Sequence, residues 1–467
     1  MKNLFFKLST MVVLILTLIF GQLPTISNAE MKTAYTNDDN KPLCVGYYPY
    51  YGNMSKVDVT KLTNMFVAFG YIHHNETLPA GTYYDPSKTN DESLIGTLYL
   101  DELTKSSLRK IPDLKDKNPN LKVSLSLGGY AGRGFCDATA TKESRAKLVN
   151  SIVQVINEYS LDGIDIDWEC PVNGGWGTIK SCDEDKVNYT LLLQDIRNSL
   201  GEDKLVTIAA GAGYEFIYSW TEFKKIGDIV DFITIMNYDY AYSGPKYNSP
   251  LYKSSNDPRG FCTDDVIKNC LATGVPKEKL VMGAAFYGRI PTAGGVTNYI
   301  DRALLTKLGF TQQDTAYIYS DIIKYIGKNG VEERWDDEAK NPYLVYVDPQ
   351  TKEEHFIMQY ENQKSLSIKG RYVKELGLGG IMVWETTQDV HGSLLNSINR
   401  GLYTDFAAEK CPDVNTDHLI DIADLAIVAS MYNVQASVDE SVSNCDFNND
   451  DIIDLFDLTL LAKNFSF

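Results

Sequence analysis

Short apolar runs recur along this chain and alternate with longer stretches of mixed polarity. The apolar runs, each of five to eight residues, lie at 43–48, 65–72, 122–128, 161–167, 205–210, 232–237, 280–286 and 380–384. Amphipathic stretches at 142–159 and 189–200 lie between them and predict helices. Repeated β/α units form parallel sheets, and eight units in about 360 residues favour a closed (β/α)8 TIM barrel with insertions. An open, doubly wound α/β sheet is the alternative.

The interval between the last two apolar runs is long enough to hold a small domain. Residues 288–379 contain a helix-like stretch at 317–329 and a strand-like stretch at 343–347. Structureless loops of this length are uncommon in compact domains. We therefore predict a small α+β insertion rather than a bare loop.

The C-terminal region contains an internal repeat. Residues 413–425 and 446–458 share one pattern, with oxygen-bearing side chains at positions 1, 3, 5, 9 and 12, as in a 12-residue calcium loop. An apolar, helix-like run follows each copy, so a small all-α calcium-binding module is predicted. Acidic turns without metal are the alternative. The predicted Ca²⁺ ligands are Asp413, Asn415, Asp417, Asp421, Asp424, Asp446, Asn448, Asp450, Asp454 and Asp457.

Two positions of these loops depart from the usual calcium-loop pattern. Position 6, usually a glycine that permits a sharp turn, is His418 in one copy and Asp451 in the other. Position 12 is an aspartate, which is shorter than the usual bidentate glutamate.

The N-terminus has the composition of a secretory signal. Lys2 and Lys7 precede an apolar run at 11–20, and small residues at 27–29 form a plausible cleavage site. The apolar run is too short for a stable membrane anchor. We therefore expect residues 1–29 to be removed, and the mature protein to be secreted without a membrane anchor.

Charge and cysteine content narrow the function classes further. The formal charge is −18, which opposes a nucleic-acid partner. Residues 411–467 carry eleven acidic residues and one basic residue, so this tail stays disordered or binds cations. Export makes disulfides plausible among the eight cysteines. The expected pairs are Cys170–Cys182, Cys262–Cys270 and Cys411–Cys445, with Cys44 a buried thiol.

The segment 162–169, with sequence DGIDIDWE, concentrates acidic residues in an otherwise apolar strand. Alternate side chains of a strand point to opposite faces, so Asp165, Asp167 and Glu169 share one face. Buried, crowded carboxyl groups have raised pKa values, which suits a group that donates a proton near neutral pH. An exposed acidic strand and a metal site are the alternatives.

This segment resembles the D-x-x-D-x-D-x-E signature of family 18 glycoside hydrolases, the family of many chitinases. Further stretches resemble motifs of that family in the same order, namely S-x-G-G at 126–129, M-x-Y-D at 236–239, Y-G-R at 287–289 and the last strand at 380–385. The resemblance spans residues 40–405. It implies a catalytic barrel there, and a chitinase insertion domain within 288–379 that deepens the cleft.

The resemblance also implies a mechanism and site residues. Spacing alone allows Asp167 to be a nucleophile, but this family uses the substrate's own N-acetyl oxygen, with retention of configuration. Glu169 is then the general acid and base, Asp167 orients the acetamido group, Asp165 tunes Asp167, and Tyr238 binds the acetamido group. No cofactor is implied for catalysis. The implied substrate-binding residues are Trp384, Asp239, Met236, Tyr287, Arg289, Tyr47, Phe69 and Tyr130.

Several of these residues have a structural alternative. Trp384 and the other aromatic residues could serve core packing, and Arg289 could simply pair with a buried carboxylate. Gly128 and Gly129 are expected to permit close approach of the backbone rather than to bind anything.

The tail at 406–467 resembles a dockerin, a calcium-dependent module that binds a cohesin on a scaffoldin. The resemblance implies a cohesin partner, and a cell-surface location if a multienzyme complex anchors it. Partner choice in such modules is often set at loop positions 10 and 11, here 422–423 and 455–456.

Three functions fit the barrel motifs. The first is a secreted chitinase that cuts β-1,4 linkages between N-acetylglucosamine units of chitin or chitooligosaccharides. The second is an endo-β-N-acetylglucosaminidase acting on N-glycans, although such relatives usually lack the insertion. The third is a non-catalytic lectin, which commonly lacks the acid found here as Glu169.

Overall fold

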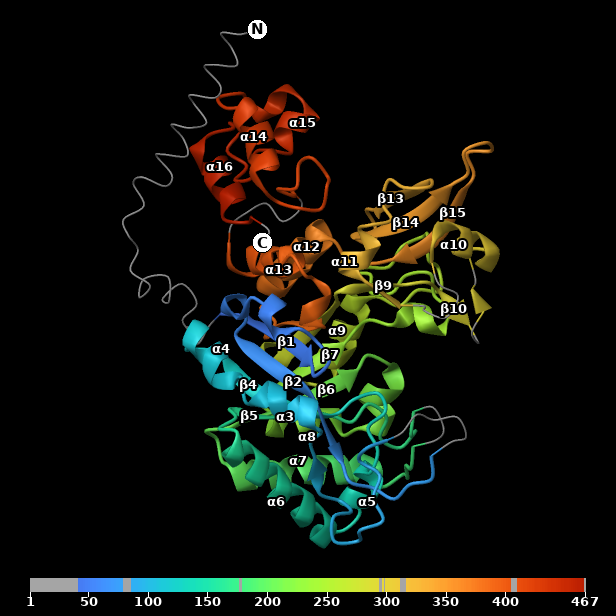
Figure 1. Cartoon of the computed structure of the whole chain (residues 1–467), viewed down its shortest axis with the longest axis vertical. Helices are drawn as coiled ribbons and strands as arrows, with labels where there is room; N and C mark the ends of the chain where they lie inside the picture. Colours follow the sequence, from blue (N-terminus) through green and yellow to red (C-terminus); the bar gives the residue numbers. More distant parts are fainter. Residues whose placement is uncertain are drawn as a thin grey trace.

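The computed structural model describes residues 41–78, 85–175, 179–293, 296–297, 299–310, 316–404 and 410–465. The predicted signal segment 1–29 lies outside these residues. Figure 1 shows a barrel of strands ringed by helices, an antiparallel sheet to one side of it, and a small helical C-terminal unit next to α12 and α13.

Eight parallel strands form a closed barrel. β16 pairs with β8 and with β1, and β1 pairs with β2, so that the sheet has no free edge. The closed barrel is confirmed, the open sheet is excluded, and predicted strand ends differ from the observed ones by at most two residues. The strands are β1 (Leu43–Pro49), β2 (Asn64–Ile72), β4 (Lys122–Gly128), β5 (Gly163–Asp167), β6 (Leu205–Gly211), β7 (Phe232–Met236), β8 (Leu280–Ala285) and β16 (Gly380–Trp384). The short β3 (Leu98–Tyr99) pairs antiparallel with β2.

Helices surround the barrel, and both predicted helices are present. Capping boxes at Thr141 and Asn362 begin α6 and α12. They satisfy free backbone N–H groups at the N-terminus of each helix. The helices of this part are α3 (Glu102–Leu108), α4 (Ile111–Lys117), α5 (Phe135–Thr139), α6 (Lys142–Glu158), α7 (Asp185–Leu200), α8 (Phe223–Ile229), α9 (Thr263–Ala272), α12 (Gln363–Leu376) and α13 (Ser393–Tyr403). Short 3₁₀ or π turns are η1 (Met54–Lys56), η2 (Val59–Lys61), η3 (Phe216–Trp220), η4 (Tyr240–Ser243), η5 (Lys277–Lys279) and η6 (Thr386–Gln388).

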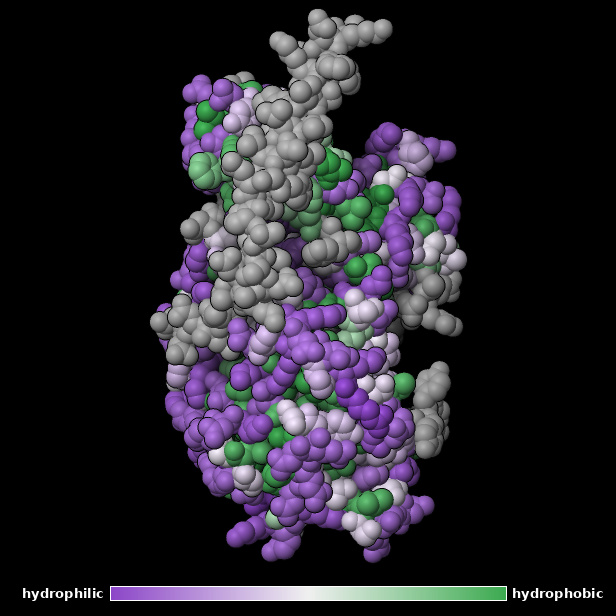
Figure 2. Space-filling model, turned by 60° about the vertical axis from the view of Figure 1, so that its left-hand side comes forward, coloured by the Kyte–Doolittle hydropathy of each residue, from purple (hydrophilic) through white to green (hydrophobic). Residues whose placement is uncertain are grey.

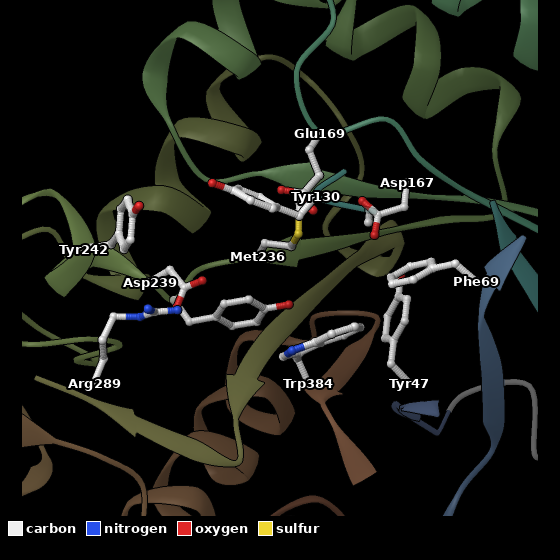
Figure 3. A pocket seen from close by; sticks show the side chains of 12 residues that line it. Tyr47, Phe69, Tyr130, Asp167, Glu169, Met236, Asp239, Tyr242, Arg289 and Trp384 are labelled. Carbon is white, nitrogen blue, oxygen red and sulfur yellow. The ribbon is translucent and has the colours of Figure 1, made fainter. Parts of the chain in front are cut away.

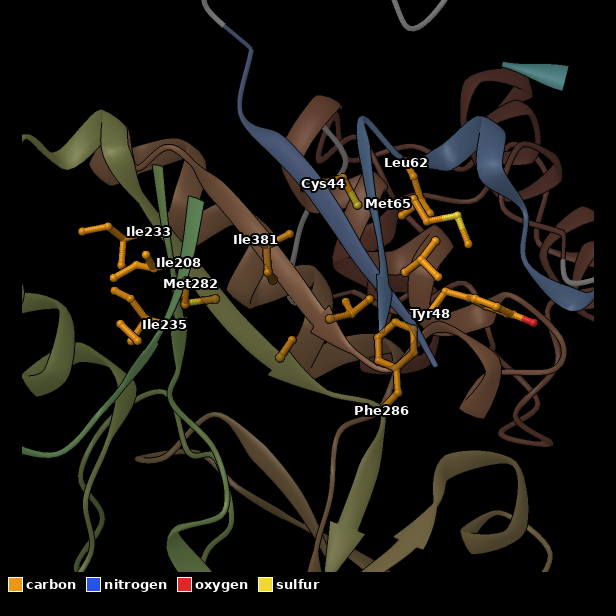
Figure 4. Close-up of a cluster of buried hydrophobic side chains, with 14 of the residues drawn as sticks. Cys44, Tyr48, Leu62, Met65, Ile208, Ile233, Ile235, Met282, Phe286 and Ile381 are labelled. Carbon is orange, nitrogen blue, oxygen red and sulfur yellow. The ribbon is translucent and has the colours of Figure 1, made fainter. Parts of the chain in front are cut away.

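Strand alternation divides the core into two parts. Outward residues such as Ile208, Ile235 and Ile381 pack between the strands and the helices (Figure 4). Inward residues such as Phe66 and Met382 form a smaller cluster inside the barrel. Because both faces of every strand are covered, the strands read as nearly continuous apolar runs.

The insertion contains a five-stranded antiparallel sheet and two short helices, so it has the predicted α+β character. The strand order of this sheet is β12-β9-β15-β14-β13. Only Tyr319–Ile322 (α11) of the helix-like stretch at 317–329 is helical, because Tyr317 pairs with Gly288 of β9 and Gly327 has φ 75°. Its elements are β9 (Tyr287–Arg289), β10 (Thr292–Ala293), β11 (Val296–Thr297), α10 (Arg302–Leu308), β12 (Ala316–Ile318), α11 (Tyr319–Ile322), β13 (Val331–Asp336), β14 (Asn341–Val347) and β15 (Glu354–Gln359).

The C-terminal unit has a hydrophobic core of its own, which includes Ile420, Phe447 and Leu458. Its elements are α14 (Ile422–Ser430), η7 (Ala436–Val438), α15 (Glu440–Ser443) and α16 (Leu455–Ala462). It contacts the barrel helices through polar groups. The Gln363 amide donates to the His418 carbonyl oxygen at 3.2 Å, and Arg400 Nη1 donates to Asn464 Oδ1 at 3.4 Å.

None of the helices in the described ranges is both long and apolar enough to cross a membrane. Figure 2 shows one face that is largely hydrophilic, with hydrophobic side chains visible between polar ones.

The cysteines do not form the expected pairs. The structure joins none of the eight. Cys182, predicted to pair with Cys170, instead has its sulfur 3.5 Å from that of Cys136. The expected pairs followed proximity in sequence, whereas the loop after β5 folds back onto α5. Cys44 is a buried thiol, as predicted, and burial raises its pKa to about 12.

Candidate active site

The acidic row lies at the C-terminal end of β5, at the mouth of the barrel. Asp165 and Asp167 point inward, and Ile164 and Ile166 pack outward against the helices, as strand alternation predicts. Glu169 lies two residues beyond the strand end and lines the same cleft as Asp167 (Figure 3). The C-terminal ends of barrel strands hold the active sites of this architecture.

Asp165 is fully buried and surrounded by hydroxyl groups. Its Oδ2 accepts from Tyr47 Oη and from Ser126 Oγ, both at 2.8 Å, and its Oδ1 accepts from Thr207 Oγ1 at 2.7 Å. Burial raises the pKa of Asp165 to about 6, although these three donors oppose the rise. Four barrel strands therefore converge on one carboxyl group.

Asp167 has a different environment, because its Oδ1 is buried and has no hydrogen-bond partner among the described residues. Burial raises its pKa well above the usual value, and the charges of Glu169 and Asp165 raise it further. A buried acceptor without a partner is costly. Asp167 also lines the cleft, so its carboxyl group lies next to the space where a ligand would bind.

Two glycines let β4 approach the acidic row closely. Gly128 has φ 121°, and a Cβ there would lie 2.2 Å from the Asp167 carbonyl oxygen. Gly129 has φ 86° and donates its N–H to that oxygen at 2.9 Å. The prediction that these glycines permit close backbone approach is confirmed.

Glu169 lies across the cleft from Trp384 (Figure 3). Burial raises the pKa of Glu169 to about 7, and the negative charge of Asp239 contributes to the rise. Asp239 is itself held by Tyr287 Oη at 2.6 Å and by Arg289 Nε at 2.9 Å. The Arg289–Asp239 pair thus fixes a charge that acts on the carboxyl group of Glu169.

Tyr238 lies in the smaller core cluster, and its Oη is 3.9 Å from Met382 Sδ. Burial raises the Tyr238 pKa well above its usual value, and the charge of Asp167 adds to this. The phenol therefore keeps its proton and can donate a hydrogen bond.

Three aromatic rings meet at the floor of the cleft. The Trp384 ring stacks on Phe69 with 5.7 Å between centroids and an interplanar angle of 22°. Tyr47 lies 5.7 Å from the same indole ring. An apolar aromatic surface suits the C–H face of a pyranose.

The cleft has a volume of about 650 Å³, and most of the predicted site residues line it. Asp165 and Tyr287 do not line it, but each is hydrogen-bonded to a residue that does, Tyr47 and Asp239 respectively. Sequence reasoning missed Ala209 and Tyr242. The signal for Tyr242 was its position three residues after Asp239, in the same loop. The lining residues are Tyr47, Phe69, Tyr130, Asp167, Glu169, Ala209, Met236, Tyr238, Asp239, Tyr242, Arg289 and Trp384.

The two acidic loops of the C-terminal unit fold alike. Asp413 Oδ2 accepts from the His418 N–H at 2.9 Å, and Asp446 Oδ2 accepts from the Asp451 N–H at 3.1 Å. Both donors occupy position 6 and have φ 68°, so they adopt the backbone conformation that glycine usually provides. Non-glycine residues at position 6 are therefore compatible with the loop.

The predicted calcium ligands differ in the contacts that they make within the C-terminal unit. Asp421 and Asp454, at position 9, cap the N-termini of α14 and α16. Carboxylate oxygens of Asp446, Asp450 and Asp457 lie within 4.8 Å of one another. Asn415 and Asn448 instead donate to the aspartate at position 5 of the same loop.

The first loop is similarly crowded. Burial raises the pKa of Asp413 to about 7, and the charge of Asp424 adds to the rise. Crowded carboxylates with oxygen-only donors fit a hard divalent cation such as Ca²⁺.

A closed parallel barrel with carboxyl groups at its C-terminal strand ends, above an aromatic floor, has the layout of a (β/α)8-barrel glycoside hydrolase. A family model described as glycosyl hydrolases family 18 matches residues 44–389. The chain therefore belongs to glycosyl hydrolase family 18. Catalysis in this family needs no cofactor.

Named relatives agree with this family. Chitinase A1 of Niallia circulans is 32% identical over 457 aligned residues, covering 86% of this chain and 64% of that protein. Chitinase ChiW of Paenibacillus sp. FPU-7 is 34% identical with a TM-score of 0.63, covering 78% of this chain and 43% of that structure. A family 18 N-acetylglucosaminidase of Paenibacillus barengoltzii is 29% identical with a TM-score of 0.63, covering 77% and 100%.

Proposed function

We propose that this protein is a chitinase that hydrolyses β-1,4 linkages between N-acetylglucosamine units with retention of configuration. The observation that carries the proposal is the pair formed by Asp167 and Glu169. Asp167 offers a buried acceptor oxygen without a hydrogen-bond partner among the described residues. Glu169, in the same cleft, has a pKa of about 7. Catalysis would need no cofactor.

In this mechanism the substrate's acetamido oxygen attacks the anomeric carbon. Glu169 protonates the leaving glycosidic oxygen and then removes a proton from water. Asp167 Oδ1 accepts the acetamido N–H and stabilises the positive charge of the oxazolinium ring. Asp165, held by three hydroxyl groups, tunes Asp167 through its charge, and Tyr238 donates to the acetamido oxygen.

The remaining cleft residues would bind the sugar chain. Trp384 and Phe69 offer an apolar platform beneath one ring. Asp239 and Arg289 lie on the side of the cleft away from Phe69 (Figure 3) and offer polar groups to hydroxyls. Tyr130, which is 59% exposed, lies at the rim.

The first test measures dye release from an N,N′-diacetylchitobioside conjugate and glycan release from a glycoprotein. We expect rapid dye release and little glycan release. The reverse result would favour an endo-β-N-acetylglucosaminidase, and no release from either would favour a lectin. A product profile on chitin oligomers separates internal chain cleavage from an N-acetylglucosaminidase activity, the activity named for the Paenibacillus barengoltzii relative.

We further propose that the protein is secreted and organised in three parts. These are a signal peptide at 1–29, a catalytic barrel at 40–405 with an insertion domain within 288–379, and a dockerin at 406–467. The two acidic loops would each bind Ca²⁺ through the predicted oxygen ligands. The dockerin would bind a cohesin on a scaffoldin, which would hold the enzyme outside the cell or at its surface.

Exposed apolar residues at the loop ends support docking. Ile422 and Leu455 are each 50% exposed, and Phe456 is 68% exposed. They stay exposed even though the C-terminal unit has a hydrophobic core of its own. These residues occupy positions 10 and 11 of the loops. An exposed apolar pair on each repeat fits a protein partner better than solvent.

Binding to a panel of immobilised cohesins tests this proposal. We expect one cohesin to bind with Ca²⁺ present and to be released by EDTA. Phe456→Ala should weaken binding, whereas Asp439→Asn, outside both loops, should not. Calcium-dependent folding without binding to any cohesin would indicate a purely structural calcium module.

A further inference from the structure

Helix α5 contacts both ends of the loop that carries Glu169. The Phe135 ring stacks on Trp168, immediately before Glu169, with 4.9 Å between centroids and an interplanar angle of 9°. The next residue of the helix, Cys136, has its sulfur 3.5 Å from the sulfur of Cys182. Adjacent residues of one short helix therefore hold the beginning and the end of this loop.

We propose that Cys136 and Cys182 form a disulfide that fixes the end of this loop to α5. Oxidation outside the cell depends on the proposed secretion. The choice of Cys136 and Cys182 as partners depends only on the position of their sulfur atoms. Cys136 is 5% exposed and Cys182 is partly exposed. No other cysteine pair in the described part of the chain has its sulfurs within contact distance.

Contacts that do not involve sulfur already set this arrangement. Lys180 Nζ pairs with Asp137 Oδ1 at 2.5 Å, and the Lys180 N–H donates to Glu76 Oε2 at 3.1 Å. The same Glu76 side chain accepts from the Gly134 N–H at 2.8 Å. These contacts join the segments next to Cys136 and Cys182. The fold therefore brings the two sulfurs together before any disulfide forms.

The chemistry of bond formation requires an oxidant such as a small-molecule disulfide. The more exposed thiolate, that of Cys182, attacks the small disulfide, forms a mixed disulfide and releases one thiol. The Cys136 thiolate then attacks the Cys182 sulfur and releases the second thiol. Two cysteine protons pass to the two released thiolates, so the small disulfide is reduced as the cysteines are oxidised.

Burial raises the pKa values of both thiols, so few thiolates form once the protein has folded. Oxidation is therefore best carried out during refolding, in a buffer of reduced and oxidised glutathione.

A metal ion is the competing occupant. A carboxylate oxygen of Asp185 lies within 4.8 Å of both sulfurs. However, Asp185 Oδ2 already accepts from the Cys182 N–H at 2.9 Å, and Asp185 Oδ1 lies 3.2 Å from the Cys182 sulfur. This carboxylate therefore already positions Cys182 without a metal.

Trypsin offers a direct test, because Lys180 separates Cys170 from Cys182 in the sequence. After refolding in glutathione buffer and alkylation without reduction, we expect the peptides 134–142 and 181–186 to be linked. Linkage of 148–180 to 181–186 would show the Cys170–Cys182 pair and overturn the proposal. Alkylation of both Cys136 and Cys182, together with a zinc-dependent rise in Tm, would indicate a metal site instead.

Stability measurements give a second readout that does not depend on activity. Cys136→Ser and Cys182→Ser should each lower Tm by roughly 3–5 °C, and the double variant should lower it no further. Reduction of the wild type should reproduce the loss. Cys170→Ser is the matched control and should not change Tm; a loss as large as that of Cys182→Ser would contradict the pairing. Chitobioside hydrolysis can fail while the linked peptides are found, so the two proposals fail separately.

Discussion

Neighbouring carboxyl groups of one strand have opposite environments in this protein. Asp165 is satisfied by three hydroxyl donors, whereas Asp167 Oδ1 is buried without a partner. Glu169 faces the cleft with a pKa of about 7. Three carboxyl groups at a spacing of two residues therefore have three different environments, which suit the proposed roles of tuning residue, ligand acceptor and proton donor.

Glu169→Gln is the first residue-scale prediction. The amide cannot transfer the proton, so kcat should fall by about 10²–10⁴-fold while chitooligosaccharide affinity changes little. Kinetics with the chitobioside conjugate and calorimetry with an oligosaccharide measure the two quantities. Glu102→Gln, on an exposed helix, is the control and should behave like the wild type. Near-normal turnover in Glu169→Gln would refute its role as the acid.

The pH profile is the second prediction. A general acid must be protonated, so kcat/KM should fall as pH rises above about 7, the pKa of Glu169. The charge of Asp239 raises that pKa, so Asp239→Asn should lower it and move the alkaline limb to lower pH. Asp228→Asn, on the exposed side of α8, should leave the limb in place. An alkaline limb that does not move in Asp239→Asn would contradict this electrostatic coupling.

At the scale of elements, the close approach of β4 to β5 depends on Gly128. Gly128→Ala would place a methyl group against the Asp167 carbonyl oxygen, in a backbone conformation that disfavours side chains. We expect a loss of roughly 1–3 kcal/mol in the free energy of unfolding, measured by denaturant titration, together with reduced activity.

Gly327→Ala is the matched control, because that glycine also has positive φ but nothing within 4 Å of the added Cβ. It should cost less stability and leave activity intact. Equal losses in the two variants would show that backbone conformation, and not contact with Asp167, is responsible.

Elements whose signal is local were predictable from the sequence. The barrel strands and the inward row from Asp165 to Glu169 follow from alternation and burial. The helix predicted at 317–329 forms only at Tyr319–Ile322, because the pairing of Tyr317 with Gly288 is a long-range contact that local patterns do not encode. The predicted Cys170–Cys182 pair failed for the same reason, since the Cys182 sulfur lies next to that of Cys136 in helix α5. Tyr242 was missed because a tyrosine in a turn carries no periodic signal, and only its position three residues after Asp239 could have indicated it.

At the scale of the whole molecule, the C-terminal unit has a separate core and docks on α12 and α13 through polar groups. Its folding should depend on calcium, because crowded carboxylates such as Asp413 and Asp424 repel one another without a cation. A ligand at 100 times its Kd stabilises the folded form by about 2.7 kcal/mol.

We therefore predict that EDTA lowers the melting temperature of this unit while chitobioside hydrolysis by the barrel continues. Circular dichroism of the full chain and an activity assay in the same buffer measure both. Asp450→Asn should weaken the calcium response, and Asp439→Asn should not. A melting profile unaffected by EDTA would contradict calcium ligation.

The most direct test of the central claim compares two substrates that differ only in the acetamido group. If the substrate's own amide attacks the anomeric carbon, kcat/KM for a chitobioside conjugate should exceed that for the matching cellobioside conjugate by about 10³-fold or more, since intramolecular attack of this kind has a large effective molarity. Comparable kcat/KM values for the two conjugates would contradict the account.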